Sequence, residues 1–188
     1  MDIKVLIGTD VVIKKIAELA KEITASGYRE LTTITVLRGA QWFSERLRKE
    51  LSELGVETEN MPMRVSSYGK DTKSSGKIEL ILEPQGNLED KDLLIVEDIV
   101  DSGITMDFLL KYLWAKQPSS LKVCTLLNKP ARRKIEVNLD YVGFEVPDKF
   151  LIGCGLDYQG NYRNLPYVGY VETAQIDGEK GDKNHGKS

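Results

Sequence analysis

The sequence contains a single histidine, His185, and it lies in the polar closing stretch DGEKGDKNHGKS. Serine–histidine–aspartate triads, cysteine–histidine pairs and histidine-rich zinc sites all require an imidazole at the reacting centre. None of these sites is expected here. If the chain is an enzyme, its chemistry must come from carboxylates, lysine or arginine, backbone amides or a hard metal ion.

Cysteine is also scarce. The two cysteines, Cys124 and Cys154, lie in the apolar stretches LKVCTLL and FLIGCGL, and they form no CxxC pair. Metal and redox sites normally show such close spacing. We therefore expect both to be reduced, buried residues that act as small hydrophobic side chains.

The chain has neither an excess of basic residues nor a long apolar run. Its 188 residues carry a net charge of −3, which argues against a surface built for nucleic acid. No apolar run approaches the roughly 20 residues that cross a bilayer, and MDIKVLIGTD does not resemble a signal peptide. We expect one domain over residues 1–175, a disordered polar tail over 176–188, no membrane or nucleic-acid partner, and a cytoplasmic location.

Hydrophobic periodicity predicts an α/β fold. A helix is expected from a cap at Thr9-Asp10 to Gly27, because apolar residues recur at the spacing of one helix face: Val12, Ile16, Leu19 and Ile23. Further helices are predicted for 40–55 and 104–117, and strands for 31–37, 61–68, 77–82, 93–100, 121–127, 140–146, 149–156 and 167–172. Alternation of strands and helices is typical of a central, mostly parallel, twisted sheet flanked by helices.

The stretch LLIVEDIVDSGITM, residues 93–106, begins as a buried strand and then becomes acidic. A strand, a glycine turn and a helix form the architecture of a phosphate site. The amides around Gly103, the helix start at Ile104 and the hydroxyls of Ser102 and Thr105 can all donate to an anion.

The carboxylates of this stretch, Glu97, Asp98 and Asp101, would repel phosphate, so they need another use. Carboxylates accept hydrogen bonds from sugar hydroxyls and help to hold Mg²⁺. Together with the glycine turn, they predict a site for a phosphorylated ribose. The plainer alternative is that these acids only end a strand and cap a helix.

The motif VEDIVDSGIT resembles the phosphoribosyl-pyrophosphate motif of type I phosphoribosyltransferases, in the form found in the hypoxanthine-guanine branch. The resemblance covers roughly residues 4–173. It implies a small hood built from N- and C-terminal segments beside the sheet. It also implies phosphoribosyl pyrophosphate and a 6-oxopurine as substrates, Mg²⁺ as cofactor, and assembly as a homodimer or homotetramer.

Two further segments extend the resemblance. VLRGA, residues 36–40, is similar to the family's pyrophosphate loop, which implies a cis peptide bond between Leu37 and Arg38 and pyrophosphate contacts from Arg38 and Gly39. Many members of the family carry lysine at the position of Arg38. SSYGKDTKSSGK, residues 66–77, is similar to the family's lid, which begins at Ser67 and Tyr68. The alternatives are a surface arginine in a turn and a plain hairpin connection.

The base site is implied by LLNKP and by VGFEVPDKFLIGCGLDYQGNYRNL, residues 142–165. Lys129 would donate to the 6-oxygen of the purine, Phe150 would stack on the ring, and Leu151 would offer backbone groups to its edge. Asp157 would border the base and bind Mg²⁺, and Arg163 would contact pyrophosphate. Taken alone, these residues could equally be a strand-end lysine, a core aromatic and a turn-forming aspartate.

The implied reaction gives each acidic residue a task. Residues 102–105 would anchor the 5′-phosphate, Glu97 and Asp98 would address the ribose hydroxyls or the metal, and Asp101 is the candidate general base. Adjacent strand residues point to opposite faces. Either Glu97 or Asp98 therefore sits on the turn, or only one of them makes direct contact.

Three alternatives remain open from the sequence. An enzyme on the same scaffold could act on adenine, orotate or uracil, although the Lys129 and Phe150 segments argue against this. A protein of this fold could bind RNA and sense nucleotides, or the chain could be an inactive homologue. Preference among hypoxanthine, guanine and xanthine is not fixed by the sequence.

Overall fold

The computed structural model describes residues 2–67 and 78–171. Tyr68, most of the predicted lid and the tail 176–188 lie outside these residues. The main sheet has six strands, ordered β4 (Ile78–Leu82), β3 (Glu57–Ser67), β2 (Glu30–Val36), β5 (Asp92–Val100), β6 (Ser120–Asn128) and β7 (Tyr141–Glu145). All neighbours pair in parallel except β4, which runs antiparallel to β3. The predicted mostly parallel sheet is confirmed.

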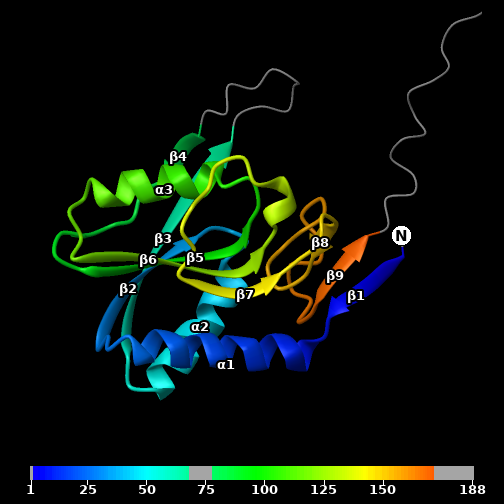
Figure 1. Ribbon diagram of the computed structural model, residues 1–188, viewed down its shortest axis with the longest axis horizontal. Helices are drawn as coiled ribbons and strands as arrows, with labels where there is room; N and C mark the ends of the chain where they lie inside the picture. Colours follow the sequence, from blue (N-terminus) through cyan, green and yellow to red (C-terminus); the bar gives the residue numbers. More distant parts are fainter. Residues whose placement is uncertain (1, 68–77, 172–188) are drawn as a thin grey trace, which may run out of the picture.

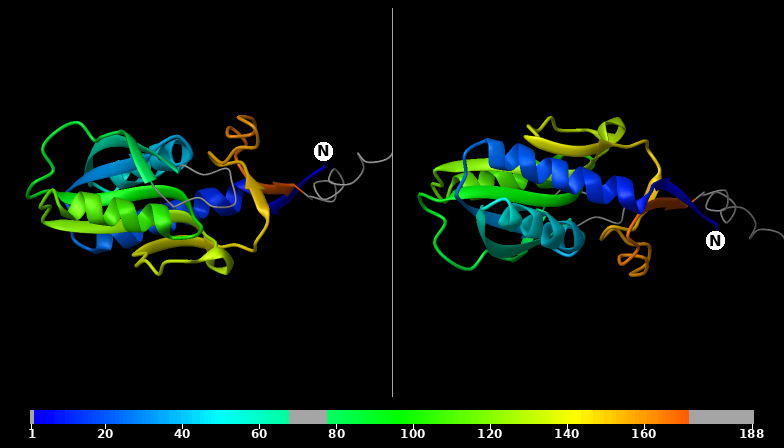
Figure 2. Two further views of the ribbon diagram at one scale, coloured as in Figure 1. Left: turned by 90° about the horizontal axis from the view of Figure 1, so that it is seen from above. Right: turned by 90° about the horizontal axis from the view of Figure 1, so that it is seen from below.

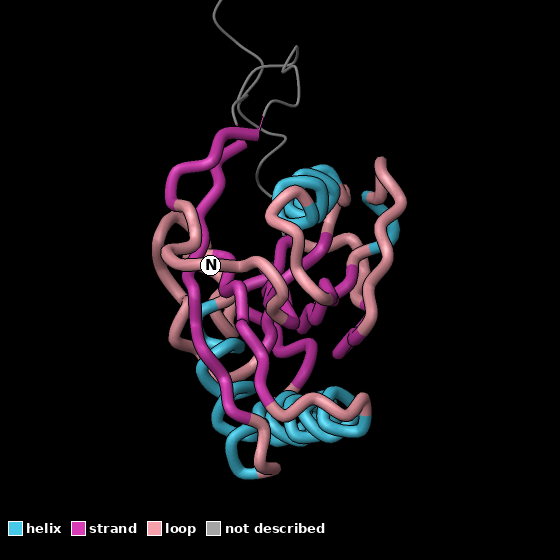
Figure 3. The backbone as a smooth tube through the Cα atoms, turned by 90° about the vertical axis from the view of Figure 1, so that its left-hand side faces the viewer, coloured by secondary structure: helices cyan, strands magenta, loops and turns pink. Residues whose placement is uncertain are grey.

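Helices cover both faces of this sheet. Helices α1 (Thr9–Ala25) and α2 (Gln41–Glu53) lie on one face and α3 (Ile104–Trp114) on the other (Figure 1). Seen from above, α3 lies over the sheet, and seen from below α1 does (Figure 2). Viewed end on, the strands lie between the helices (Figure 3). A short 3₁₀ turn (Pro130–Arg132) follows β6.

Strand β5 is apolar because both of its faces are covered. Leu94 and Val96 pack in the core beneath α1 and α2, whereas Leu93 and Ile95 pack in the core beneath α3. A strand buried on both faces has no solvent side and therefore shows no polar alternation. This central strand carries the acidic motif to the carboxyl edge of the sheet.

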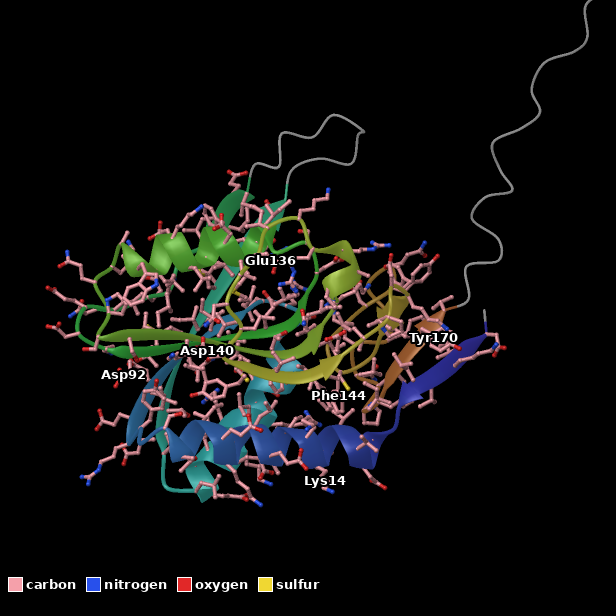
Figure 4. All side chains as sticks on the ribbon, in the orientation of Figure 1. Lys14, Asp92, Glu136, Asp140, Phe144 and Tyr170 are labelled. Atoms are coloured by element: carbon pink, nitrogen blue, oxygen red, sulfur yellow. The ribbon has the colours of Figure 1, made fainter. Side chains whose placement is uncertain are left out.

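A second, smaller sheet forms the hood that the resemblance implied. Its antiparallel strands are ordered β1 (Ile3–Ile7), β9 (Val168–Val171) and β8 (Phe150–Ile152). The pairing of β1 with β9 joins the two ends of the described chain. Strand β1 was not among the predicted elements, because buried and exposed residues do not alternate along its five positions. The hood lies at the end of the main sheet where β5 and β6 finish, as Tyr170 in the hood and Asp92 at the start of β5 show (Figure 4).

Several predicted boundaries are wrong, three of them for identifiable reasons. The N-cap residue of helix α1 is Gly8, which has no side chain to accept a capping hydrogen bond. Thr9 and Asp10 are already inside the helix and do not cap it. Strand β3 begins at Glu57, because the polar run Glu57–Asn60 gains parallel pairing with β2 that its composition does not signal. The strand predicted for 149–156 ends at Ile152, because Gly153, Cys154 and Gly155 all have positive φ.

The two cysteines are free and buried, which confirms the expectation. Burial raises the pKa of the Cys154 thiol to about 12 and that of Cys124 further still. Both thiols therefore stay protonated and unreactive at neutral pH. In the part of the chain that the structure describes, no helix combines the length and hydrophobicity needed to cross a membrane.

Candidate active site

Two adjoining cavities lie at the carboxyl edge of the main sheet. The loop cavity, of about 270 Å³, lies over the turn between β5 and α3. The hood cavity, of about 330 Å³, lies between that turn and the 149–163 segment. Both are lined by Gly39, Asp98, Ile99 and Asp101, so they form one continuous cleft. Ligands of open α/β sheets bind at this edge.

The loop cavity collects most of the residues predicted for the ribose phosphate. Its lining includes Glu97, Asp98, Asp101, Ser102, Gly103 and Thr105. Ile104 does not line it, and its backbone N–H donates to Ser102 Oγ at 3.4 Å. A role for Ile104 toward phosphate therefore stays a prediction.

Gly103 makes the bend possible. It caps α3 with φ 81°, a left-handed conformation that residues with a Cβ rarely adopt. A Cβ built there would lie 2.1 Å from the carbonyl oxygen of Ile135. The first amides of a helix have no partner within the helix, so the start of α3 directs donors toward this edge.

Glu97 and Asp98 are both within β5 and both only 8% exposed. Glu97 Oε1 accepts a hydrogen bond from the Asp98 N–H at 3.2 Å, and Asp98 Oδ1 accepts one from the Ile99 N–H at 2.9 Å. Neither residue sits on the turn, which excludes the first of the two alternatives, and direct contact by only one of them stays a prediction. Asp98 lines both cavities, whereas Glu97 lines only the loop cavity.

Burial dominates the electrostatics of this pair. Loss of solvent, followed by the Asp98 carboxylate, raises the pKa of Glu97 well above its ordinary value. Burial also raises the pKa of Asp98. Two adjacent buried carboxylates cost stability when both are charged. Such a pair is best explained by a ligand that needs it.

We expect Glu97→Gln to stabilise the free protein at neutral pH by roughly 1–3 kcal/mol, the scale of a buried group's desolvation. The raised pKa means that the folded state binds more protons than the unfolded state between the ordinary pKa of 4.5 and the raised one. The free energy of unfolding of the wild type therefore falls as pH rises through that window. Glutamine cannot ionise, so the variant should lose this part of the pH dependence.

Urea unfolding between pH 5 and pH 8 measures the effect, with Glu53→Gln on the exposed surface of α2 as the matched control. Glu53→Gln should leave the pH profile unchanged. A Glu97→Gln protein that is less stable than wild type at neutral pH would show that the Glu97 carboxylate is not a source of strain in the fold.

Asp101 lies at the junction of the two cavities. Its Oδ1 atom is buried and has no hydrogen-bond partner, and its Oδ2 atom is 4.0 Å from Nη1 of Arg132. Buried polar atoms are almost always paired. An unpaired carboxylate oxygen between two cavities is suited to accept a hydrogen bond or a proton from a ligand.

The predicted cis peptide bond between Leu37 and Arg38 is confirmed. Gly39 lies in close contact with two neighbours. A Cβ on Gly39 would lie 1.9 Å from Asp98 Oδ2, and a Cβ on Gly155 would lie 1.9 Å from the carbonyl oxygen of Gly39. Glycine is thus required at both positions, and the 37–40 turn packs between β5 and the hood.

Arg163 and Asp157 lie together in the hood cavity with Arg38. The Arg163 guanidinium contacts the Asp157 carboxylate and donates from Nη1 to the carbonyl oxygen of Gly155 at 2.7 Å. The Gly160 N–H donates to Asp157 Oδ2 at 2.7 Å. These contacts fix both charged side chains beside the 37–40 turn.

The residues predicted for a purine also line the hood cavity. Lys129 is only 5% exposed, and its Nζ donates to the carbonyl oxygen of Lys149 at 2.8 Å. Burial lowers the pKa of Lys129. Phe150 is 46% exposed, so it is not a core residue, and its ring meets that of Tyr158 edge to face at 5.3 Å. Its neighbour Leu151 is buried.

The carboxylates predicted to bind metal divide between the cavities. Asp98 and Asp157 both line the hood cavity, and Glu97 does not. No group of three or more such ligands occurs among residues 2–67 and 78–171. Mg²⁺ commonly binds one or two carboxylates together with water and substrate phosphates. Asp98 and Asp157 share the hood cavity, and they are the two carboxylates expected to bind the metal there.

Sequence reasoning missed two cations of the hood cavity, Arg132 and Lys149. The basic run KPARRK, which begins at Lys129 and contains Arg132, was an available signal, as was the position of Lys149 next to Phe150. Only the fold brings these residues together. Arg132 Nε is 2.6 Å from Asp148 Oδ1. Of the two predicted lid residues, Ser67 ends β3 and Tyr68 lies outside the described residues.

Comparison with known proteins agrees with this geometry. Residues 9–159 match the phosphoribosyl transferase domain model. The chain is 43% identical to a hypoxanthine-guanine phosphoribosyltransferase of Bacillus subtilis, over 91% of this chain and 94% of that protein. It is 41% identical to one from Mycobacterium avium, over 91% and 87%. A solved hypoxanthine-guanine phosphoribosyltransferase of Bacillus anthracis superposes with a TM-score of 0.85 at 37% identity, covering 91% of this chain and 100% of that one.

Fold, cleft and sequence similarity thus agree over almost all of the described residues. The chain belongs to the phosphoribosyl transferase family, within the group that contains the hypoxanthine-guanine phosphoribosyltransferases.

Proposed function

We propose that this protein transfers the 5-phosphoribosyl group of phosphoribosyl pyrophosphate to N9 of hypoxanthine or guanine, giving IMP or GMP and pyrophosphate, with xanthine as a further acceptor to be tested. One observation carries the proposal. The amide-rich turn after β5 and the cavity holding Lys129 and Phe150 meet at Asp101, whose buried Oδ1 atom has no hydrogen-bond partner. The names of the relatives from Bacillus subtilis and Mycobacterium avium support it.

We propose a place in the two cavities for each part of the donor. The 5′-phosphate binds the amides and hydroxyls of residues 102–105, and the ribose hydroxyls face Glu97 and Asp98. The pyrophosphate lies against Arg38, Gly39 and Arg163. Mg²⁺ held with Asp98 and Asp157 would neutralise the pyrophosphate and improve it as a leaving group.

The base binds on the other side of Asp101. Phe150 offers an exposed ring for stacking. The Lys129 ammonium can donate to a 6-oxygen but cannot accept from a 6-amino group. As N9 attacks the anomeric carbon and pyrophosphate leaves, Asp101 accepts the proton that the imidazole ring of the purine gives up.

Initial rates with hypoxanthine, guanine, xanthine and adenine, each with and without Mg²⁺, test the proposal. We expect turnover of the 6-oxopurines that requires Mg²⁺, and little turnover of adenine. Turnover of adenine alone, or of no purine at all, would contradict it.

We further propose that the protein works as a homodimer or homotetramer in the cytoplasm. The two free, buried thiols suit a reducing compartment. Light scattering of the purified protein measures the assembly.

We expect Lys129→Ala to lower kcat/KM for hypoxanthine by roughly 10- to 100-fold, since a hydrogen bond to a charged group contributes about 1.5–3 kcal/mol. The ratio of kcat/KM for hypoxanthine to kcat/KM for adenine should fall, because the variant lacks the ammonium donor that favours a 6-oxygen over a 6-amino group. Lys111→Ala, on the exposed surface of α3, is the control and should match wild type. If the ratio of the two bases is unchanged in Lys129→Ala, Lys129 does not recognise the 6-position.

A further inference from the structure

We infer that Arg133 is a positioning residue that holds the 101–105 loop with its backbone N–H groups turned toward the donor's 5′-phosphate. The inference rests on the proposed function and goes beyond it, because Arg133 lines neither cavity. Its action is therefore through the loop and not on the substrate.

Arg133 connects the ends of two neighbouring strands. Its Nε donates to the carbonyl oxygen of Asp101 at 3.0 Å, just after β5. Its Nη2 donates to the side-chain Oδ1 of Asn128, the last residue of β6. The planar guanidinium presents several N–H donors in a fixed fork. One side chain thus fixes the loop relative to the strand that leads to Lys129.

The residues after Arg133 complete the support beneath the loop. The backbone N–H groups of Lys134 and Ile135 both donate to the carbonyl oxygen of Ser102, at 2.8 and 3.1 Å. The carbonyl oxygen of Ile135 and the Cδ of Arg133 lie closest to where a Cβ on Gly103 would be, at 2.1 and 3.1 Å. The 133–135 segment therefore packs directly against the bend.

The carbonyl contacts set the direction of the amides. In a trans peptide the C=O and the following N–H point in opposite directions. Because the carbonyl of Asp101 points to Arg133, the N–H of Ser102 points away from it. The carbonyl of Ser102 points to Lys134 and Ile135, so the N–H of Gly103 also points away from the 133–135 segment.

The loop cavity lies on that opposite side, since Ser102 and Gly103 line it and residues 133–135 do not. Neither N–H is paired with an acceptor from the part of the chain that the structure describes. Successive free N–H groups at a bend form an anion site. Binding is tighter when such donors are ordered before the ligand arrives.

Without Arg133, the Asp101 carbonyl would turn to water and the peptide between Asp101 and Ser102 would be free to rotate. We expect Arg133→Met, which keeps the length of the stem, to raise KM for phosphoribosyl pyrophosphate about tenfold, the loss of one charge-assisted hydrogen bond. KM for hypoxanthine and the melting temperature should change little. Arg29→Met, an exposed arginine at the far end of β2, is the control and should match wild type.

A binding measurement separates the loop from catalysis. In ¹H–¹⁵N spectra, ribose 5-phosphate should shift the amide signals of Ser102 and Gly103 in the wild type, and these shifts should shrink in Arg133→Met. Asn128→Ala should have a smaller effect in the same direction. The double variant should be no weaker than Arg133→Met alone, because both residues act through one contact.

The outcomes distinguish the inference from the proposed function. A wild type that turns over no purine with phosphoribosyl pyrophosphate contradicts the proposed function. An active wild type whose Arg133→Met variant keeps both donor KM and amide shifts overturns the inference alone. An equal rise in KM for both substrates, with a lower melting temperature, assigns Arg133 a purely structural role and also overturns it.

Discussion

Replacing Asp101 with asparagine should lower kcat by roughly 10²- to 10⁴-fold, the usual contribution of a general acid or base. The amide has nearly the same shape as the carboxylate but cannot take a proton from the purine. Asp101 Oδ1 is buried without a partner, so the substitution breaks no hydrogen bond at that atom. KM for phosphoribosyl pyrophosphate should change far less than kcat, because the backbone of residues 102–105 is untouched. Steady-state and single-turnover kinetics measure both quantities.

Asp107→Asn provides the matched control. Asp107 lies on the first turn of α3 and pairs with the exposed Lys111 at 2.7 Å, outside both cavities. Loss of that pair should cost only about 0.3–0.5 kcal/mol of stability and no activity. If Asp101→Asn turns over at a near-normal rate, Asp101 is not the base, and the proton must leave through solvent.

The second large effect is expected from Gly39→Ala. The added Cβ would lie 1.9 Å from Asp98 Oδ2 and 2.6 Å from Asp98 Cγ. Neither partner can easily move, because Asp98 is buried in β5 and the Gly39 carbonyl is packed against Gly155. Overpacking of this kind typically costs about 1–3 kcal/mol. Displacement of the 37–40 turn should raise KM for phosphoribosyl pyrophosphate and lower kcat/KM by about 100-fold or more, since small misplacements at a site are costly.

Gly8→Ala is the control for adding a methyl group to a glycine. Nothing lies within 4 Å of a Cβ at Gly8, so the variant should fold and react normally. Calorimetric titration with inorganic pyrophosphate and Mg²⁺ isolates binding from turnover. Normal pyrophosphate affinity in a folded Gly39→Ala protein would show that close backbone approach at this turn is not needed.

Much of the site was predictable because its residues are consecutive in the chain. The apolar run before Glu97 requires a strand covered on both faces, and Gly103 with the following helix requires a bend that leaves amides unpaired. Most of the residues that line the loop cavity are thus contained in one short segment. Local order of this kind depends on backbone geometry, which sequence patterns report directly.

The acid pair shows what such reasoning leaves open. Strand alternation predicted that Glu97 and Asp98 could not both lie in the strand and both face the ligand. The structure keeps both in β5, and Asp98 reaches both cavities because Gly39 leaves room for its carboxylate. That space comes from a glycine 59 positions earlier in the chain. No local pattern around Asp98 contains this information.

The sequence by itself determined the parallel α/β fold and the acidic strand–turn–helix motif, because each follows from neighbouring residues. Only the tertiary structure decided that Arg133 supports the loop, that Arg132 and Lys149 join the hood cavity, and that β1 closes the hood beside β9. These depend on contacts between segments distant in the chain. Such contacts are fixed by the packing of the whole core, so the residues that make them carry no local signature.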